Sequence, residues 1–142
     1  MKLVVVAQGK IKDRGLRAVA DDYLGRIRKV TRCEEIEVGS AAELARAVPA
    51  DALSVALEVH GEAVTSAELS KRLERWFSRG KGTVSFVIGG AEGIPKALSE
   101  KCDVRLSLSA LTLPHRLARV VLFEQLYRAL TLIRGEPYAR ED

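Results

Sequence analysis

Residues 106–130 read LSLSALTLPHRLARVVLFEQLYRAL and join a short strand to a long helix. Serines alternate with leucines at the start, as in a half-buried strand, but the alternation continues for longer than a short strand needs. Pro114 and His115 then open the helix, because proline is tolerated in the first helical turn and not further in. The helix is expected to run from about residue 114 to residue 133 and to end at Gly135. The stretch therefore predicts a strand, an irregular apolar loop and a C-terminal helix, in that order.

Strand-like and helix-like segments alternate along the rest of the chain. The expected strands are short apolar or β-branched runs at residues 3–7, 36–38, 53–59, 84–88 and 104–108. The first expected helix covers residues 13–29, and the second is capped by Ser40 and ends before Pro49. The third begins with the capping box of Thr65 and Glu68 and ends at Gly80, and a short fourth helix begins at Pro95. This alternation predicts an α/β domain with a mostly parallel sheet flanked by helices. Because no repeat or linker divides the sequence, we expect residues 1–142 to form one domain.

The composition excludes several classes of protein. With 47% hydrophobic and 30% charged residues, the chain is too apolar to be disordered. No apolar run approaches the roughly 18 residues of a membrane-spanning helix, and the N-terminus lacks the apolar stretch and cleavage site of a signal peptide. Cys33 and Cys102 stand alone, without the spacing of a disulfide framework or a zinc site. We therefore expect a cytoplasmic protein that binds neither a metal nor a membrane.

The charged residues are unevenly distributed. Residues 1–32 carry nine basic and three acidic side chains, residues 33–70 carry one and eight, and residues 71–142 carry thirteen and eight. The net charge of +4 thus comes from two basic ends that flank an acidic middle. This distribution suits a polyanion such as nucleic acid, because each neutralised phosphate releases a counterion. A solvated basic surface would give the same distribution, so the charge alone leaves both interpretations open.

Three predicted strand exits are candidate ligand sites, because ligands bind beyond the carboxyl ends of parallel strands. They are residues 57–61, 89–93 and 108–115. The second, GGAEG, allows a close approach of backbone to a ligand but matches neither GxGxxG nor a P-loop, so it is either a cradle or an ordinary strand-to-helix turn. The third is an apolar loop whose backbone amides could hold the edge of an adenine. His115, at its end, is either a structural contact or a base.

The long helix is apolar on nearly every side. Its apolar residues are Leu117, Val120, Val121, Leu122, Phe123, Leu126, Tyr127, Leu130, Leu132 and Ile133. A helix that is hydrophobic all round is buried on more than one face. The sheet can cover one face, so we expect another to meet a second copy of the chain in a homodimer. Glu124, Gln125 and Arg128 lie within this helix and need polar partners.

Three segments together resemble the RlmH family of SPOUT-class methyltransferases. They are IGGAEG at residues 88–93, the stretch at residues 106–130 and RGEPYAR at residues 134–140, and the resemblance extends to the start MKLVVVAQGK. Members use S-adenosylmethionine to methylate N3 of the pseudouridine at position 1915 of 23S rRNA. The resemblance therefore implies a ribosomal substrate, a C-terminal trefoil knot, which is a rare exception among folds, and an obligate homodimer with cofactor pockets at its interface.

The resemblance also implies site residues. The family's cofactor contacts fall on Leu57, Gly89, Leu108, Ser109, Ala110, Leu111, Thr112 and Leu113. The family's C-terminal tail reads Tyr-His-Arg and reaches toward the partner's cofactor and the target base. Here it reads Tyr138-Ala139-Arg140, so the tail histidine is missing. This departure argues against a mechanism in which the tail histidine is the general base.

The implied reaction makes two chemical demands. The methyl donor is already activated, so alignment can supply much of the acceleration. The N3–H of the target must also lose a proton, and Arg140 would stabilise the negative charge that develops on the flanking carbonyls. Water or His115 would take the proton, and the base is left unassigned.

Three other functions stay open on the sequence. A non-catalytic RNA-binding dimer would keep the basic ends but would not bind S-adenosylmethionine. A methyltransferase of small molecules would gain nothing from basic ends, so a strong dependence of activity on salt would argue against it. A SPOUT enzyme that acts on another RNA would share every feature above except the target.

Overall fold

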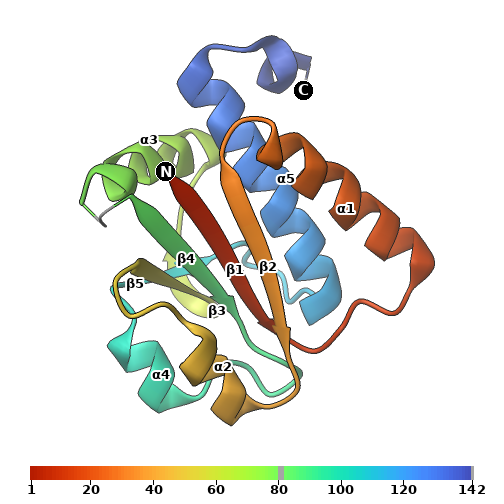
Figure 1. Cartoon of the computed structure of the whole chain (residues 1–142), viewed down its shortest axis with the longest axis vertical. Helices are drawn as coiled ribbons and strands as arrows, with labels where there is room; N and C mark the ends of the chain where they lie inside the picture. Colours follow the sequence, from red (N-terminus) through yellow and green to blue (C-terminus); the bar gives the residue numbers. More distant parts are fainter. Residues whose placement is uncertain (80–81, 142) are drawn as a thin grey trace.

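The computed structural model describes residues 1–79 and 82–141, with side chains described as far as residue 139 in the last element. Within this part of the chain, five parallel strands alternate with five α-helices (Figure 1). The elements are β1 (Lys2–Gln8), α1 (Arg14–Arg28), β2 (Arg32–Val38), α2 (Ala41–Ala47), β3 (Leu53–Ala63), α3 (Ser66–Arg79), β4 (Thr83–Ile88), α4 (Lys96–Lys101), β5 (Val104–Ser107), α5 (His115–Arg134) and the 3-10 helix η1 (Pro137–Glu141). The predicted α/β class and order of elements are confirmed.

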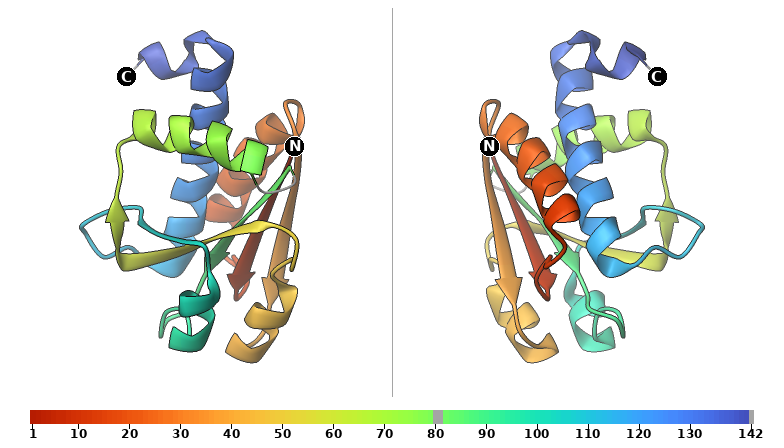
Figure 2. Two further views of the ribbon diagram at one scale, coloured as in Figure 1. Left: turned by 90° about the vertical axis from the view of Figure 1, so that its left-hand side faces the viewer. Right: turned by 90° about the vertical axis from the view of Figure 1, so that its right-hand side faces the viewer.

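The sheet has the strand order β2-β1-β4-β3-β5, and helices cover both of its faces (Figure 2). Successive side chains of a strand point to opposite faces, so the uninterrupted apolar run of β1 serves two layers. Leu3 and Val5 pack with α1, α3 and α5 in the larger core, whereas Val4 and Val6 pack with α2 and α4 in the smaller one. The sequence LVVV at residues 3–6 thus reflects burial on both sides.

β1, β4 and β5 end within one residue of a common row at one edge of the sheet, and β3 continues past that row to Ala63. In the parallel register, Ile88 of β4 is paired with Ala7 of β1 and with Leu57 of β3, and Leu57 is paired with Leu106 of β5. These four residues form one row across the sheet. The loops after them therefore leave the sheet next to one another, which is the condition for a shared ligand site.

Local sequence signals set the helix ends. Asp13, Ser40 and Thr65 accept hydrogen bonds at the starts of α1, α2 and α3, with Leu16 N donating to Asp13 Oδ1 at 2.9 Å. Gly135 ends α5 in the left-handed conformation at φ 70°, which glycine adopts without strain. The predicted stop of the third helix falls on Gly80, which lies outside the described residues.

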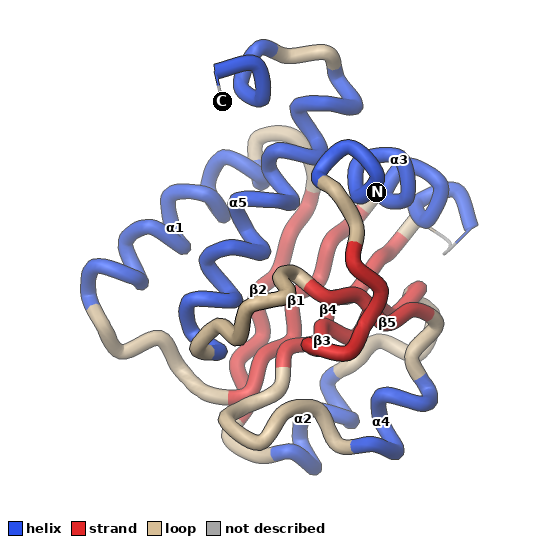
Figure 3. The backbone as a smooth tube through the Cα atoms, turned by 180° about the vertical axis from the view of Figure 1, so that it is seen from behind, coloured by secondary structure: helices blue, strands red, loops and turns tan. Residues whose placement is uncertain are grey.

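The helix α5 is covered largely by its own chain. It packs on the sheet and between α1 and α3, and its buried residues include Val120, Phe123 and Leu126 (Figure 3). Two helices of the same chain thus supply much of the cover that the sequence analysis assigned to a second subunit, and the homodimer itself stays a prediction. The polar residues within it do have partners, since Ser66 donates to Gln125 Oε1 at 2.6 Å and Arg128 pairs with Glu124 at 2.8 Å.

The C-terminal tail is ordered differently from the sequence-based expectation. Because Gly135 and Pro137 end the helix, the sequence predicts that residues 138–142 leave α5 as an irregular strand with little apolar burial. Instead, residues 137–141 form η1, which packs back on the end of α5. Tyr138 makes an edge contact with Tyr127, with ring centroids 4.8 Å apart. The ring contact supplies the apolar burial that a strand would have lacked.

Among the described residues, no helix combines the length and the apolarity that crossing a membrane requires.

Candidate functional site

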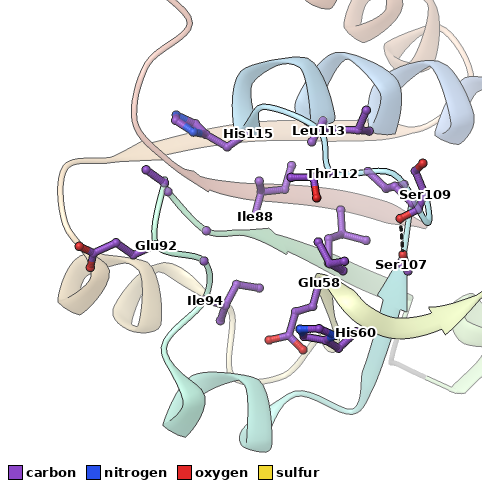
Figure 4. Close-up of a pocket in the computed structure, with 18 of the residues that line it drawn as sticks. Glu58, His60, Ile88, Glu92, Ile94, Ser107, Ser109, Thr112, Leu113 and His115 are labelled. Carbon is purple, nitrogen blue, oxygen red and sulfur yellow. Dashed lines mark hydrogen bonds between the residues drawn. The ribbon is translucent and has the colours of Figure 1, made fainter.

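The three predicted strand exits converge on a cavity of about 430 Å³ at the carboxyl edge of the sheet (Figure 4). Of the residues predicted to bind a cofactor, those that line it are Leu57, Gly89, Leu108, Ser109, Leu111, Thr112 and Leu113. His115 lines it too, from the first turn of α5. Ala110 is exposed in the same loop and is not among the residues that line the cavity. The volume is that of a pocket for a nucleotide-sized ligand.

The glycine turn forms one wall of the cavity by folding back on itself. Gly93 N donates to Gly90 O at 2.9 Å, and Gly93 has a φ of 82°. A Cβ added to Gly89 would collide with the carbonyl of Gly93 and would lie 2.6 Å from Ile94 N. Gly89 is therefore required by the turn itself. A larger side chain at Gly89 would therefore displace the backbone of the turn as well as fill space beside the cavity.

The loop after β5 is braced by its own serines. Ser107 Oγ donates to Ser109 O at 2.8 Å, and Ser109 Oγ accepts from Leu111 N at 2.9 Å. The amide of Leu111 is thus already bonded within the loop. The Leu111 side chain is 76% exposed, the largest value among the exposed large hydrophobic side chains of the described residues. The loop offers backbone and leucine side chains to the cavity from a fixed conformation.

A bulge in β3 shapes the first predicted strand exit, residues 57–61, of which the sequence analysis named only Leu57 as a cofactor contact. Leu57 and Glu62 are both paired with Leu106, so residues 58–61 are displaced from the ladder, and three of them, residues 58–60, line the cavity. Gly61 makes this possible, because a Cβ there would lie 2.7 Å from the Leu106 carbonyl oxygen. The bulge brings Glu58 and His60 to the cavity (Figure 4). Their positions directly after Leu57 place them at a predicted strand exit, but the alternation of polar and apolar residues does not predict a bulge.

His115 lies across the cavity from Glu58 and His60 (Figure 4). Burial lowers the pKa of His115 below its ordinary value of 6.5, and the charges of Arg116 and Arg119 lower it further. The imidazole is therefore neutral at pH 7, so one of its ring nitrogens can accept a proton.

A buried ion network fixes the elements around His115. Arg119 is fully buried on α5 and pairs with Glu35 at 3.0 Å and with Glu37, both on β2, while Arg17 of α1 pairs with Glu35 at 2.6 Å. Arg119 also donates to Gly9 O at 2.9 Å, in the connection between β1 and α1. The Nε of Arg119 has no hydrogen-bond partner among the described residues. The network joins α1, β2 and α5 behind the cavity.

The predicted catalytic tail lies at the other end of α5. Tyr138 donates to Glu124 Oε2 at 2.8 Å, and its hydroxyl lies 3.1 Å from that of Tyr23. Burial and these hydrogen bonds raise the pKa of Tyr138 well above its ordinary value. Because α5 has 20 residues, it is about 30 Å long. The chain thus brings His115 to its own cavity but not Tyr138, and the side chain of Arg140 lies outside the described residues.

Among the described residues, no group of three or more His, Cys, Asp or Glu side chains is arranged to hold a metal ion. Cys33 and Cys102 are both free and buried.

The sequence is similar to curated proteins over nearly its whole length. Residues 1–139 match the family model described as "Predicted SPOUT methyltransferase". The ribosomal RNA large subunit methyltransferase H of Sorangium cellulosum is 57% identical, over 98% of this chain and 99% of that protein. The protein of the same name from Acetivibrio thermocellus is 37% identical, over 99% of this chain and the whole of that protein.

Solved structures share the fold at low sequence identity. A probable methylase family protein from Haemophilus influenzae superposes with a TM-score of 0.61 at 13% identity, over 96% of this chain and 69% of that one. The SpoU methyltransferase AviRb from Streptomyces viridochromogenes gives 0.53 at 16% identity, over 94% of this chain and 61% of that one. The family resemblance predicted from the sequence is confirmed, and this chain belongs to the SPOUT methyltransferase family, together with the ribosomal RNA large subunit methyltransferases H.

Proposed function

We propose that this chain transfers a methyl group from S-adenosylmethionine to N3 of the pseudouridine at position 1915 of 23S rRNA, on the assembled ribosome. The observation that carries the proposal is the convergence of three strand exits on one cavity in a chain 57% identical to a protein named for methylating large-subunit rRNA. A ribosomal substrate implies a cytoplasmic location. Membership of the family also leads us to expect the C-terminal trefoil knot.

The cavity suits a cationic cofactor. Among the described residues that line it, none is Lys or Arg, whereas Glu58 and Glu92 are acidic. S-adenosylmethionine supplies a methyl group already activated on a positively charged sulfonium. The glycine turn at Gly89 and the loop residues 108–113 would hold the adenosine part with backbone groups and leucine side chains, with Leu57 beneath them. This assignment follows the carboxyl-edge rule for parallel sheets.

The cofactor pocket can be tested with Ala118→Leu. Ala118 lines the cavity from α5, and leucine favours a helix nearly as well as alanine does, so the added side chain should occupy ligand space without unfolding the helix. We expect calorimetry to show the affinity for S-adenosylmethionine lowered by at least about tenfold, a loss of about 1.4 kcal/mol. Ala18→Leu, at an exposed position of α1, is the matched control. An unchanged affinity for S-adenosylmethionine in Ala118→Leu, with native circular dichroism, would show that the cofactor does not bind in this cavity.

Two groups of this chain would take part in the reaction, one by accepting a proton and the other by stabilising negative charge. A neutral His115 at the cavity, or water, would accept the N3 proton of the base. Arg140 would stabilise the negative charge on the flanking carbonyls, with Tyr138 holding the tail that carries it. Neither tail residue can reach the cavity of its own chain if η1 stays packed on the far end of α5. We therefore propose a homodimer in which each tail serves the partner's cavity, and sedimentation should show a dimer at micromolar concentration.

The substrate is tested by methyl transfer to ribosomes from a strain that lacks the modification. Labelled S-adenosylmethionine should transfer one methyl group per large subunit, and mass mapping should place it on the pseudouridine. Ribosomes from a strain that already carries the modification are the matched control and should accept none. Comparing 23S rRNA stripped of protein with intact ribosomes decides which is the substrate. Transfer to a different nucleotide, or none to either RNA, would overturn the proposal.

A further inference from the structure

Four exposed cations surround the connection between β1 and α1. Lys10 and Lys12 lie in this connection, Arg14 begins α1, and Arg116 lies in the first turn of α5. Within the described part of the chain, no ion pair joins any of the four to a carboxylate, whereas other surface cations such as Lys2 and Arg72 have one. We refer to Lys10, Lys12, Arg14 and Arg116 as the basic loop surface.

Two of these charges stand at helix ends that disfavour them. The N-terminus of a helix carries a partial positive charge, so cations there are unfavourable and acidic residues are favoured. Arg14 and Arg116 nevertheless stand in the first turns of α1 and α5, and neither turn contains an acidic residue. Cations at positions that disfavour them indicate a role outside the fold.

The basic loop surface is held in a fixed shape. Gly9 N donates to Val38 O at 2.8 Å, and Ile11 N donates to Glu37 Oε2 at 3.3 Å. Arg116 Nε donates to Lys10 O at 3.1 Å, which joins the α5 part of the surface to the loop part. The charges are therefore presented from preorganised backbone, which lowers the entropic cost of binding.

This surface adjoins the cofactor cavity on one side only. A Cβ built on Gly9 would lie 3.7 Å from His115 Nε2, and His115 lines the cavity. Glu58 lies across the cavity from His115, and its carboxylate would repel a polyanion on that side (Figure 4). Of these two sides, the connection between β1 and α1 is the one that favours the approach of a phosphate backbone.

We propose that the basic loop surface binds the phosphate backbone of the RNA strand that carries the target base. The inference rests on the proposed function, since it takes RNA as the substrate class, and it adds the direction from which that RNA enters. Lys and Arg bind phosphates largely through their charge, so this contact positions the strand and does not read its sequence.

The test compares two triple variants that each remove three exposed cations. Lys10→Gln/Lys12→Gln/Arg14→Gln changes the basic loop surface and spares Arg116, whose hydrogen bond supports the loop. Lys71→Gln/Arg75→Gln/Arg79→Gln changes α3, whose C-terminal half leads to the opposite edge of the sheet. Filter binding to protein-free 23S rRNA, and the KM for ribosomes, are measured over a range of salt. Calorimetry with S-adenosylmethionine checks the cavity in each variant.

We expect the first variant to lose at least about tenfold in rRNA affinity at physiological salt, and its KM for ribosomes to rise by a similar factor. The slope of log affinity against log salt should fall by about 2, because each phosphate contact to single-stranded nucleic acid contributes about 0.7. Affinity for S-adenosylmethionine should stay unchanged. The α3 variant should bind rRNA within about twofold of the parent.

Three results would overturn the inference. Equal losses in the two variants would show a general charge effect, and a loss of cofactor affinity would make the loop part of the cofactor site. A variant that binds protein-free rRNA normally but has a raised KM for ribosomes would show contact with an acidic ribosomal protein. Failure of the proposed function is separate, because it would appear as absent methyl transfer by the unmodified protein, whereas the comparison of rRNA affinities could still be made.

Discussion

The two ends of α5 carry the two halves of the predicted active site, and they are built differently. At the N-terminal end, backbone turns and leucine side chains form much of the cavity, and Gly89 is required because backbone fills the space of a side chain. At the C-terminal end, large side chains interlock, with Tyr138 bonded to Glu124 and packed on Tyr127. About 30 Å of helix separates them. The comparison shows that, with η1 packed in this way, the tail can act on a cavity only in a second copy of the chain.

The largest expected effect concerns the buried network at the cavity end. Arg119→Met removes the charge that holds Glu35 and Glu37, and breaking a buried pair costs about 3–5 kcal/mol. We expect the lower end of this range, because Arg17 still pairs with Glu35. Urea unfolding at one fixed protein concentration measures the change, since the apparent stability of a dimer depends on concentration.

Lys96→Met is the control for Arg119→Met. Lys96 is 92% exposed in its side chain and lies 3.9 Å from Glu100, so its loss should change the free energy of unfolding by less than about 0.5 kcal/mol. If Arg119→Met lowered the free energy of unfolding no more than this control, the network would not stabilise the fold. The hydrogen bond from Arg119 to Gly9 O would then not explain why Gly9 lies beside His115.

The next effect concerns the tail end and is on rate rather than stability. Loss of one preorganised charge contact typically lowers the rate by about 10²–10³. We expect Arg140→Ala to lower turnover by this factor while dimerisation and cofactor affinity remain. Arg134→Ala, which removes the partner of Glu136 at the end of α5, should leave turnover within about twofold. Steady-state kinetics with ribosomes decide, and a fully active Arg140→Ala protein would place the charge contact elsewhere.

A smaller effect is expected from Gly89→Ala, which tests why the cavity end contains glycine. The added Cβ meets backbone, so the turn must shift, and forced overpacking costs about 1–3 kcal/mol. We expect the stability and the affinity for S-adenosylmethionine to fall together. Gly25→Ala is a control of opposite sign, because Gly25 is exposed in α1 with open space at its Cβ, and alanine favours a helix over glycine by about 1 kcal/mol. Reduced affinity at unchanged stability would contradict the structural role of Gly89.

The elements of the fold were predictable because their signals are local. Hydrophobic periodicity and caps such as Ser40 and Thr65 lie within a few residues of the ends they set. The convergence of the strand exits followed from the parallel sheet. The bulge at Glu58 and His60 was not predictable, because it depends on the register of β3 against β5. The buried state of Arg119 also depends on contacts from distant elements, and a lone arginine in a helix reads as a surface residue.

The position of the tail shows the same limit of the sequence. Gly135 and Pro137 predicted the end of α5, but the course of residues 137–141 depends on whether they find apolar surface to pack on. Tyr138 finds the ring of Tyr127 and the hydroxyl of Tyr23, both of them far away in the folded chain from the cavity. The sequence therefore identified the candidate residues, but it did not show that the tail residues lie far from the residues that line the cavity.

The smallest effect is expected from Ala139→His, which restores the family's tail pattern. Ala139 is half-buried in η1 between Tyr138 and Arg140. If His115 or water takes the N3 proton, a second imidazole is not needed, and the rate should stay within about twofold of the parent across the pH range of about 5–9. A tail histidine that acted as the base would instead raise the rate and make it depend on a group with a pKa near 6.5, with activity falling as pH drops and the imidazole becomes protonated. Such a profile in Ala139→His would assign the proton transfer to the tail end of α5, and His115→Asn in the same background would then have no effect on it. A pH profile that matches the parent's would confine the proton acceptor to the cavity end.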